Sequence, residues 1–358
     1  MFFYFYIYIT AFFFSIFSIL AKSNFFTKMW IYFLFFLILI YVGLRDGLGS
    51  DWGSYSEMYA YSWKEKNIAI PDIGFNLISH FFYLLGAKFQ YSVFFLTFVA
   101  LVPILRLSRN YKYGVLVIFL YSFVYLTSLM GLMRQMIAIS LCLFAAEKLY
   151  QKKNRQYFFY VLTAIFFHSS AAVFFLAYFV QKVKIGRWLI FFIAVGLIII
   201  NYLIVNKVGY FLIDNGIMAI KVKEYFILPD YNQYPPYYSS SWFNTMLMIT
   251  QKLLFISIFS HYFTNIAYNH KGIFYLKIYS LSLLLNLMFI FSIPLLATRA
   301  AIYFSISEIF LLALLCQQTR YKWTCIFAVL LYGCVKYFKI LLSLYLQMVP
   351  YETILSLY

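Results

Sequence analysis

Long segments without charge are the feature that most constrains how this chain can fold. Segments 2–20, 29–44, 188–205 and 278–297 each contain about 16 to 20 residues that are almost entirely apolar. A helix of that length, at a rise of about 1.5 Å per residue, approaches the roughly 30 Å thickness of the hydrocarbon layer of a bilayer. Backbone N–H and C=O groups find no water there, so each segment has to satisfy them internally as a helix.

The composition of the whole chain agrees with a membrane protein. Of the 358 residues, 65% are apolar and only 11% are charged, whereas a soluble domain carries about 25% charged residues. Too little polar surface remains to cover a water-soluble body. We therefore expect an all-α, polytopic membrane protein with about 10–12 transmembrane helices, some of them broken or re-entrant. No linker or repeat divides residues 1–358, which predicts a single integral membrane domain.

The distribution of charge predicts which loops face which side of the membrane. The net charge is +17, from 28 Lys and Arg against 11 Asp and Glu. Segments 45–72 and 207–241 have balanced or acidic charge and are expected to be two longer periplasmic loops. The positive-inside rule explains the excess of positive charge without a nucleic-acid partner, and an anionic lipid-linked ligand is also compatible with it. The basic loops that this rule assigns to the cytoplasm are 22–28, 106–112, 148–155, 182–187, 271–277 and 320–322.

Residues 157–181 pose a topological problem, because they lie between two of these basic loops. The chain must cross the membrane an even number of times within about 25 residues, which is too short for two full spans. The sequence therefore predicts a re-entrant pair of half-helices that breaks at His168-Ser169-Ser170. Broken backbone is tolerated at that depth where it lines a polar cavity.

The stretch 45–59 concentrates acidic, basic and aromatic side chains immediately after an apolar segment. Trp52, Tyr55 and Tyr59 have the spacing of one face of a short helix. An ordinary interfacial helix with aromatic anchors is one interpretation. A functional role is the favoured one, since charged groups cluster beside the boundary of a membrane segment.

Three further polar residues lie in apolar surroundings. Arg134 begins a span on the predicted external side, and it either snorkels or serves a function. His168 requires a partner, because an unpaired imidazole there is unfavourable; Ser169 or a backbone carbonyl is the structural alternative. Arg299 is flanked by apolar residues on both sides, so it must meet a partner or a watery cavity.

The motifs that are missing from the sequence narrow the chemistry. There is no P-loop, no His-x-x-x-His or Cys/His cluster, no Gly-x-Ser-x-Gly and no Asp-x-Asp metal motif. Nucleotide hydrolysis and metal-dependent nucleotide-sugar chemistry are therefore disfavoured. We expect no metal site and no cofactor.

Four short blocks occur in an order that resembles a known family. They are Arg45…Gly49-Ser50-Asp51-Trp52…Tyr55, then Arg134-Gln135…Ala138, then Phe167-His168-Ser169-Ser170-Ala171, then Arg299…Tyr303-Phe304. Together they resemble the EpsG-like/Wzy family of bacterial polysaccharide polymerases. The first block has Gly-Ser-Asp-Trp where Gly-Thr-Asp-Tyr is expected, a conservative departure.

The resemblance implies a metal-independent glycosyltransferase of the bacterial inner (plasma) membrane, with its active site facing the periplasm. Such an enzyme takes a glycan from undecaprenyl diphosphate and joins it to a second lipid-linked repeat unit, producing O-antigen or a similar surface polysaccharide. Membrane lipid and a chain-length regulator protein are the further partners that it suggests. The alternatives are a flippase for lipid-linked oligosaccharides and a glycosyltransferase that uses a polyprenyl-monophosphate sugar.

The resemblance also implies roles for individual residues. A departing diphosphate without a metal needs fixed cations, and arginine suits this because it is always charged and binds phosphate with two donors. Arg45, Arg134 and Arg299 are expected to bind the diphosphate near one another. Either His168 or Asp51 is expected to be the base that activates the acceptor hydroxyl. The residues expected to bind substrate are Trp52, Tyr55, Gln135 and Tyr303.

Overall fold

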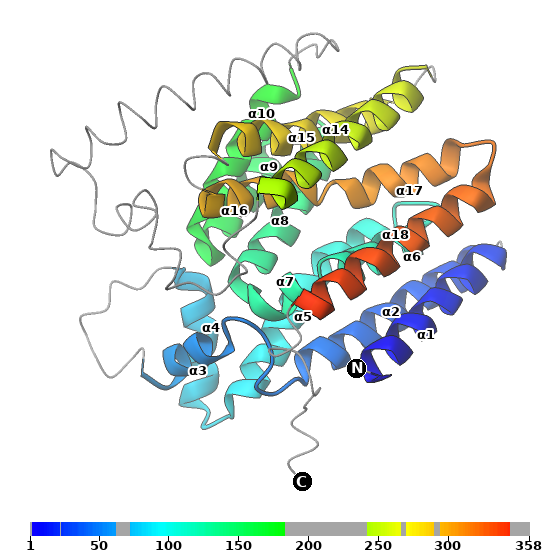
Figure 1. Ribbon diagram of the computed structural model, residues 1–358. Helices are drawn as coiled ribbons and strands as arrows, with labels where there is room; N and C mark the ends of the chain where they lie inside the picture. Colours follow the sequence, from blue (N-terminus) through cyan, green and yellow to red (C-terminus); the bar gives the residue numbers. More distant parts are fainter. Residues whose placement is uncertain are drawn as a thin grey trace, which may run out of the picture. The chain divides into compact units, whose positions relative to one another are not determined.

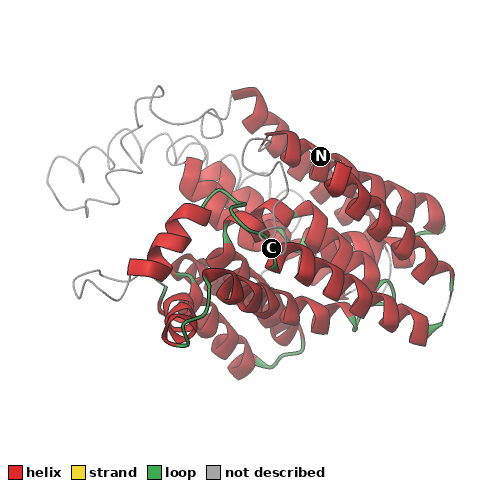
Figure 2. Cartoon of the chain, turned by 90° about the horizontal axis from the view of Figure 1, so that it is seen from below, coloured by secondary structure: helices red, strands yellow, loops and turns green. Residues whose placement is uncertain are grey.

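The computed structural model describes residues 2–21, 23–61, 72–182, 242–265, 270–289 and 294–343. Every regular element within these ranges is a helix (Figure 2). The predicted all-α fold is therefore confirmed. The predicted periplasmic loop 207–241 lies outside the described residues, as do residues 62–71 of the first loop.

Within each described range, the helices follow one another with short connections (Figure 1). Those of the first half are α1 (Phe2–Leu20), α2 (Asn24–Gly43), α3 (Trp52–Tyr61), α4 (Ile73–Leu84), α5 (Phe89–Ser108), α6 (Gly114–Val124), α7 (Leu126–Gly131), α8 (Met133–Tyr150), α9 (Asn154–Phe167), the 3₁₀ helix η1 (Ser169–Phe175) and α10 (Leu176–Val180). Those of the second half are α14 (Trp242–Asn265), α15 (His270–Phe289), α16 (Pro294–Ser305), α17 (Glu308–Gln318) and α18 (Lys322–Ser343).

Among the described residues, five helical stretches are long and apolar enough to cross a membrane. Together with the shorter apolar helices, they agree with a protein that crosses the membrane several times. The total of ten to twelve crossings stays a prediction. The five stretches are Phe25–Gly43, Phe89–Ser108, Thr245–Phe263, His270–Phe289 and Ala297–Gln318.

Two compact units make up the chain, one formed by residues 1–172 and 312–358 and the other by residues 173–311. In the second unit, α15 packs against α14 and α16. Lys277 on α15 donates a hydrogen bond to the carbonyl oxygen of Gln181 at 3.0 Å. The expectation of a single membrane domain stays a prediction.

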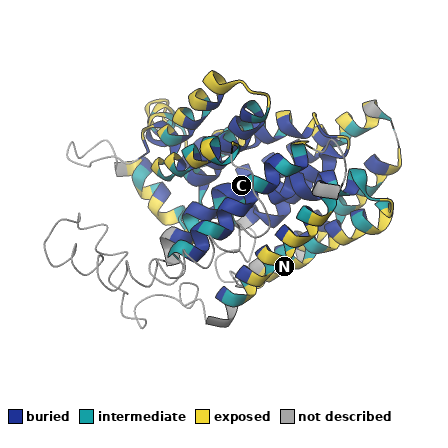
Figure 3. Ribbon diagram, turned by 90° about the horizontal axis from the view of Figure 1, so that it is seen from above, coloured by how far each residue is buried: buried dark blue, intermediate teal, exposed yellow. Residues whose placement is uncertain are grey.

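The first unit is built around α6, whose residues are all buried. Helices α1, α2, α5 and α18 pack against it, which is why an apolar helix with no polar face is stable there. Helix α1 buries Tyr4 and Ala11 and exposes Phe5, Phe13 and Phe17 on its other side (Figure 3). Phenyl rings on an outer face of this kind are suited to contact with lipid chains.

Basic side chains from three loops gather at one end of the first unit. Lys28 lies near the start of α2, Arg106 in the last turn of α5, Arg109 directly after it, and Lys148 in the last turn of α8. These residues line one pocket of about 330 Å³. Arg134 lies in the first turn of the same α8, about 21 Å away along the helix axis. Three of the six predicted cytoplasmic loops thus meet at one end of the unit, and Arg134 lies toward the other.

The chain breaks at His168, as predicted. Helix α9 ends at Phe167, and His168 has an extended backbone with φ −157° and ψ 117°. The chain then continues as the 3₁₀ helix η1 and the short α10. Residues 157–181 are therefore not one straight helix. That both ends of this segment face the same side stays a prediction.

Candidate functional site

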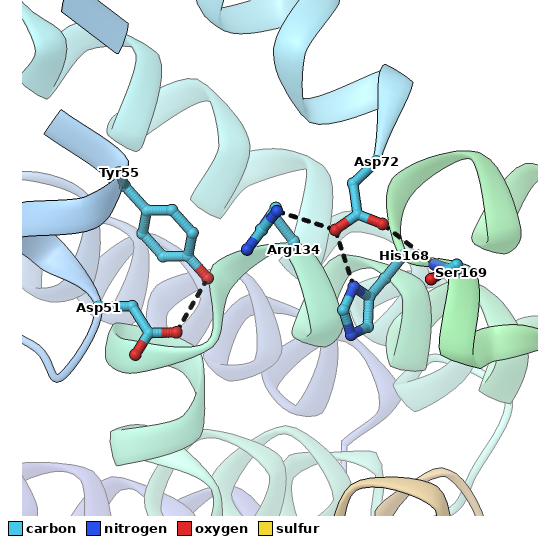
Figure 4. Close-up of polar contacts among 6 residues, drawn as sticks. All are labelled: Asp51, Tyr55, Asp72, Arg134, His168 and Ser169. Atoms are coloured by element: carbon cyan, nitrogen blue, oxygen red, sulfur yellow. Dashed lines mark hydrogen bonds and ion pairs between the residues drawn. The ribbon is translucent and has the colours of Figure 1, made fainter. Parts of the chain in front are cut away.

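A buried carboxylate, that of Asp72, lies at the centre of the polar residues in the first unit. Its side chain is only 3% exposed. The Oδ2 atom accepts from Arg134 Nη1 at 2.9 Å and from His168 Nδ1 at 3.0 Å, and Oδ1 accepts from the backbone N–H of Ser169 at 3.1 Å (Figure 4). Three separate elements therefore meet at one side chain: the start of α4, the first turn of α8 and the break after α9.

The surroundings of Asp72 keep it ionised. Burial raises the pKa of this carboxyl, but the hydrogen bond and charge of His168, the charge of Arg134 and the N–H of Ser169 together outweigh burial. The pKa of Asp72 is consequently below its ordinary value. A carboxylate in this state only accepts hydrogen bonds, so Nδ1 of His168 carries the proton that the two residues share.

The guanidinium of Arg134 has donors left for a ligand. It lies over the rings of Tyr55 and Phe75, 5.2 and 5.8 Å from their centroids. Its Nε atom is buried and has no acceptor among the described residues. A buried donor without a partner is unfavourable by about 1–3 kcal/mol. An anionic oxygen of a substrate would satisfy it and would also meet the positive charge.

Tyr55 connects Asp51 to this group. Its ring is buried and packs against Phe75 at 5.2 Å, and its hydroxyl lies 3.5 Å from Asp51 Oδ2. Burial raises the pKa of Tyr55 to about 12; the charge of Arg134 opposes the rise and that of Asp51 adds to it. The hydroxyl therefore remains protonated. Figure 4 shows the hydroxyl of Tyr55 between the carboxylate of Asp51 and Arg134.

We call Asp51, Tyr55, Asp72, Arg134, His168 and Ser169 the polar cluster. Four of these six residues, Asp51, Tyr55, Arg134 and His168, are ones that the sequence singled out for function. The structure brings them together although they come from three separate blocks of the sequence. Ser169 joins them through its backbone N–H.

Arg45 lies beside the polar cluster but is turned inward. Its side chain is fully buried and donates to the carbonyl oxygens of Leu48 at 3.1 Å, of Met130 at 2.7 Å and of Val42. The ring of Trp52 lies 5.5 Å from the guanidinium. This geometry favours a structural role, in which Arg45 fastens the loop after α2 to the end of α7. Its predicted contact with a diphosphate has not been tested.

The packing of the loop explains why a glycine occupies position 49, in the first of the four sequence blocks. Gly49 has a φ of +119°, and a Cβ atom there would lie 2.6 Å from the carbonyl oxygen of Met130. A residue with a side chain would therefore push the loop away from α7. The close approach of the two segments brings Asp51 and Tyr55 to the other members of the polar cluster.

The remaining predicted residues have surroundings of their own. Trp52 packs on Phe89, with 5.1 Å between ring centroids, and Gln135 is buried in α8. Arg299 and Tyr303 belong to α16 in the second unit, where Tyr303 is fully buried. The convergence of Arg299 with the other arginines stays a prediction.

Asp72 is the member of the cluster that sequence reasoning missed. It lies at the end of the predicted loop 45–72. In the sequence, nothing about this aspartate distinguishes it from the other acidic residues of the loop. The available signal was its position at the predicted external end of an apolar segment, directly after Pro71 and before Ile73-Gly74. Only the folded chain shows that it meets a histidine 96 residues away.

The chemistry of the cluster follows from its donors and acceptors. With Nδ1 of His168 protonated, its other ring nitrogen has a free electron pair and can accept a proton from a hydroxyl group. Arg134 next to it can bind an anionic oxygen. A group that can accept a proton and a fixed cation thus lie side by side.

Comparison with known families agrees with this chemistry. The EpsG family matches residues 28–353, which is nearly the whole chain and includes the entire polar cluster. EpsG proteins are Wzy-like polysaccharide polymerases. Neither a curated protein nor a solved structure gave a significant match. The chain belongs to the EpsG family, and its role is broadly that of a membrane-bound, glycosyltransferase-like polysaccharide polymerase.

Proposed function

We propose that this protein joins undecaprenyl-diphosphate-linked oligosaccharide repeat units into a surface polysaccharide, without a metal, at the periplasmic face of the bacterial inner membrane. One observation carries the proposal. His168 and Arg134 approach the same carboxylate oxygen at 3.0 and 2.9 Å, so a proton acceptor and a phosphate-binding cation are neighbours. Membership of a polymerase family supplies the reaction type.

In the proposed transfer, His168 and Arg134 both take part in a single displacement reaction. The acceptor hydroxyl gives its proton to the unprotonated ring nitrogen of His168, and its oxygen forms a bond to the anomeric carbon of the donor glycan. The bond between that carbon and the diphosphate oxygen breaks, and its electron pair leaves with the diphosphate. Arg134 binds the developing negative charge through donors that Asp72 does not use. Arg299 is the second cation that we propose for the leaving group.

Deletion of the gene in a strain that makes surface polysaccharide tests this function. Deletion of a polymerase gene leaves single repeat units attached to the final acceptor. A copy of the gene on a plasmid restores the long chains. Loss of all surface material, single units included, would indicate a flippase and would overturn the proposal. Supplying the purified protein with a polyprenyl-monophosphate sugar in parallel tests the donor, and polymer made from that donor alone would also overturn it.

A further inference from the structure

We propose that Asp72 is a positioning residue that holds His168 in its Nδ1–H form, so that His168 and not Asp51 accepts the proton from the acceptor hydroxyl. The inference rests on the proposed function, in which one of these two residues is the base. It is carried by the 3.0 Å contact between Asp72 Oδ2 and His168 Nδ1.

The first step of the argument concerns the two ring nitrogens of His168. A neutral imidazole carries one proton. The hydrogen-bond partners of the two ring nitrogens decide which of them holds that proton. Asp72 offers only an acceptor to Nδ1, so the proton stays there. The second nitrogen, Nε2, is then the one with the free electron pair.

The second step concerns charge during the reaction. A ring that can accept a proton is neutral, and in that form of His168 the charges of Asp72 and Arg134 cancel. When His168 accepts a proton, the group becomes positive by one unit. That charge appears beside the site where the diphosphate gains negative charge, so the proton transfer itself assists departure of the leaving group. Asp72 also stabilises the newly formed imidazolium.

The third step concerns how firmly Asp72 is placed. Its backbone has φ 68° and ψ 63°, in the left-handed region, which Asp and Asn adopt more readily than other residues with side chains. Its other carboxylate oxygen holds the N–H of Ser169, the first residue after the break. The carboxylate therefore fixes both the ring of His168 and the backbone that carries it.

Asp51 has a different environment. Its carboxylate contacts the hydroxyl of Tyr55 at 3.5 Å, a long hydrogen bond. The hydroxyl of Tyr55 lies between this carboxylate and Arg134 (Figure 4). Asp51 is therefore placed to hold Tyr55, whereas His168 stands next to the cation that meets the leaving group.

Nitrogen-15 NMR of the full-length protein with labelled histidine tests the proton position without any substrate. The chain has four histidines, and comparison of the wild-type spectrum with that of His168→Ala identifies the signals of His168. We expect the neutral ring of His168 to carry its proton on Nδ1 and to leave Nε2 unprotonated. Protonation at Nε2 alone would overturn the inference, even if the wild-type protein makes normal polymer. A protonated Nδ1 in a protein that makes no polymer would instead refute the proposed function.

A double-mutant comparison tests whether Asp72 acts through His168. Asp72→Asn preserves the size of the side chain and tolerates the left-handed backbone, but its amide N–H can donate to Nδ1 and reverse the protonation of the ring. We expect a loss in kcat of about 10²–10⁴-fold in Asp72→Asn and in His168→Ala alike. The double variant should be no slower than the slower single variant, within about threefold.

Two independent losses that multiply in the double variant would overturn the inference, as would near-normal turnover of Asp72→Asn. The matched control is Asp46→Asn, which removes a carboxylate of the same loop that accepts a hydrogen bond from Gln90 at 2.7 Å outside the cluster. It should keep normal turnover. If Asp72→Asn fails to reach the membrane, the wild-type and His168→Ala spectra still decide the proton position.

Discussion

Oδ2 of Asp72 accepts a hydrogen bond from Nδ1 of His168 at 3.0 Å, although the two residues are 96 positions apart in the sequence. The contact joins the residue that precedes α4 to the point where the helix after α8 is interrupted. The interruption at His168 is therefore held by a side chain from a distant segment. In the account given above, this one bond supports both the local fold and the state of the proposed base.

Arg134→Lys tests whether the guanidinium shape of Arg134 matters in addition to its charge. Lysine keeps the charge but lacks the planar guanidinium. Its compact ammonium cannot direct separate donors to Asp72 and to a phosphate oxygen at the same time. We expect Arg134→Lys to lose about 10²–10³-fold in turnover, nearly as much as Arg134→Ala. Polymer synthesis by purified protein in liposomes is the measurement.

Arg109→Lys is the matched control for that comparison, because Arg109 is exposed at the basic end of the first unit. It should have normal activity. Wild-type activity of Arg134→Lys would contradict a role for two-pronged phosphate binding. The same pair of substitutions at Arg299 tests its proposed contact with the leaving group, and full-length polymer from Arg299→Ala would remove it from the mechanism.

Arg45→Met separates a structural role of Arg45 from the ligand role that the sequence suggests. Methionine preserves much of the length of the side chain but leaves the carbonyl oxygens of Leu48, Met130 and Val42 without their donor. A hydrogen bond to a charged group contributes about 1.5–3 kcal/mol. We expect a midpoint of thermal unfolding several degrees lower than that of wild type. A variant with unchanged thermal stability and no polymer would instead give Arg45 a direct role with substrate.

The stability of the protein in detergent should depend on Asp72 and on pH. The pKa of Asp72 in the folded protein is below the ordinary value of 3.8, so its ionised form favours folding above that value. This contribution is lost as the pH falls through the lower pKa of the folded state. We expect wild type to be more stable than Asp72→Asn at about pH 5, and we expect this margin to shrink as the pH falls through the pKa of Asp72 in the folded state. A margin that vanishes already at pH 6 would show that Asp72 is not ionised near neutral pH.

Labelling of single cysteines tests which side of the membrane each end of the first unit faces. In a variant without the four native cysteines, Glu57→Cys on α3 and Gln151→Cys at the basic end offer exposed positions. An impermeant maleimide should label Glu57→Cys in cells with a permeable outer membrane and Gln151→Cys only after the inner membrane is opened. The reverse pattern would contradict the proposed periplasmic site.

The parts of the structure that the sequence predicted are those set by hydrophobicity and by charge along the chain. Apolar segments predicted the all-α fold, and basic loops on both sides of 157–181 predicted the break at His168. The orientation of a side chain depends on tertiary contacts, which local sequence does not contain. Arg45 and Arg134 look alike beside apolar segments, but one is turned toward backbone carbonyls and the other toward Asp72. For the same reason Asp72 could not be distinguished from other acidic residues of its loop.

The central claim is that the polar cluster transfers a glycan from a polyprenyl diphosphate. The most direct test of this claim is to measure polymer synthesis by the purified protein in liposomes. The substrate is undecaprenyl-diphosphate-linked repeat units, and a metal chelator is present. We expect a ladder of polymers from wild type, with release of undecaprenyl diphosphate for each bond formed. His168→Ala should bind the lipid-linked unit normally but turn over about 10²–10⁴-fold more slowly, whereas His261→Ala in the second unit should match wild type. A full ladder from His168→Ala, or none from wild type unless a metal is added, would contradict the account.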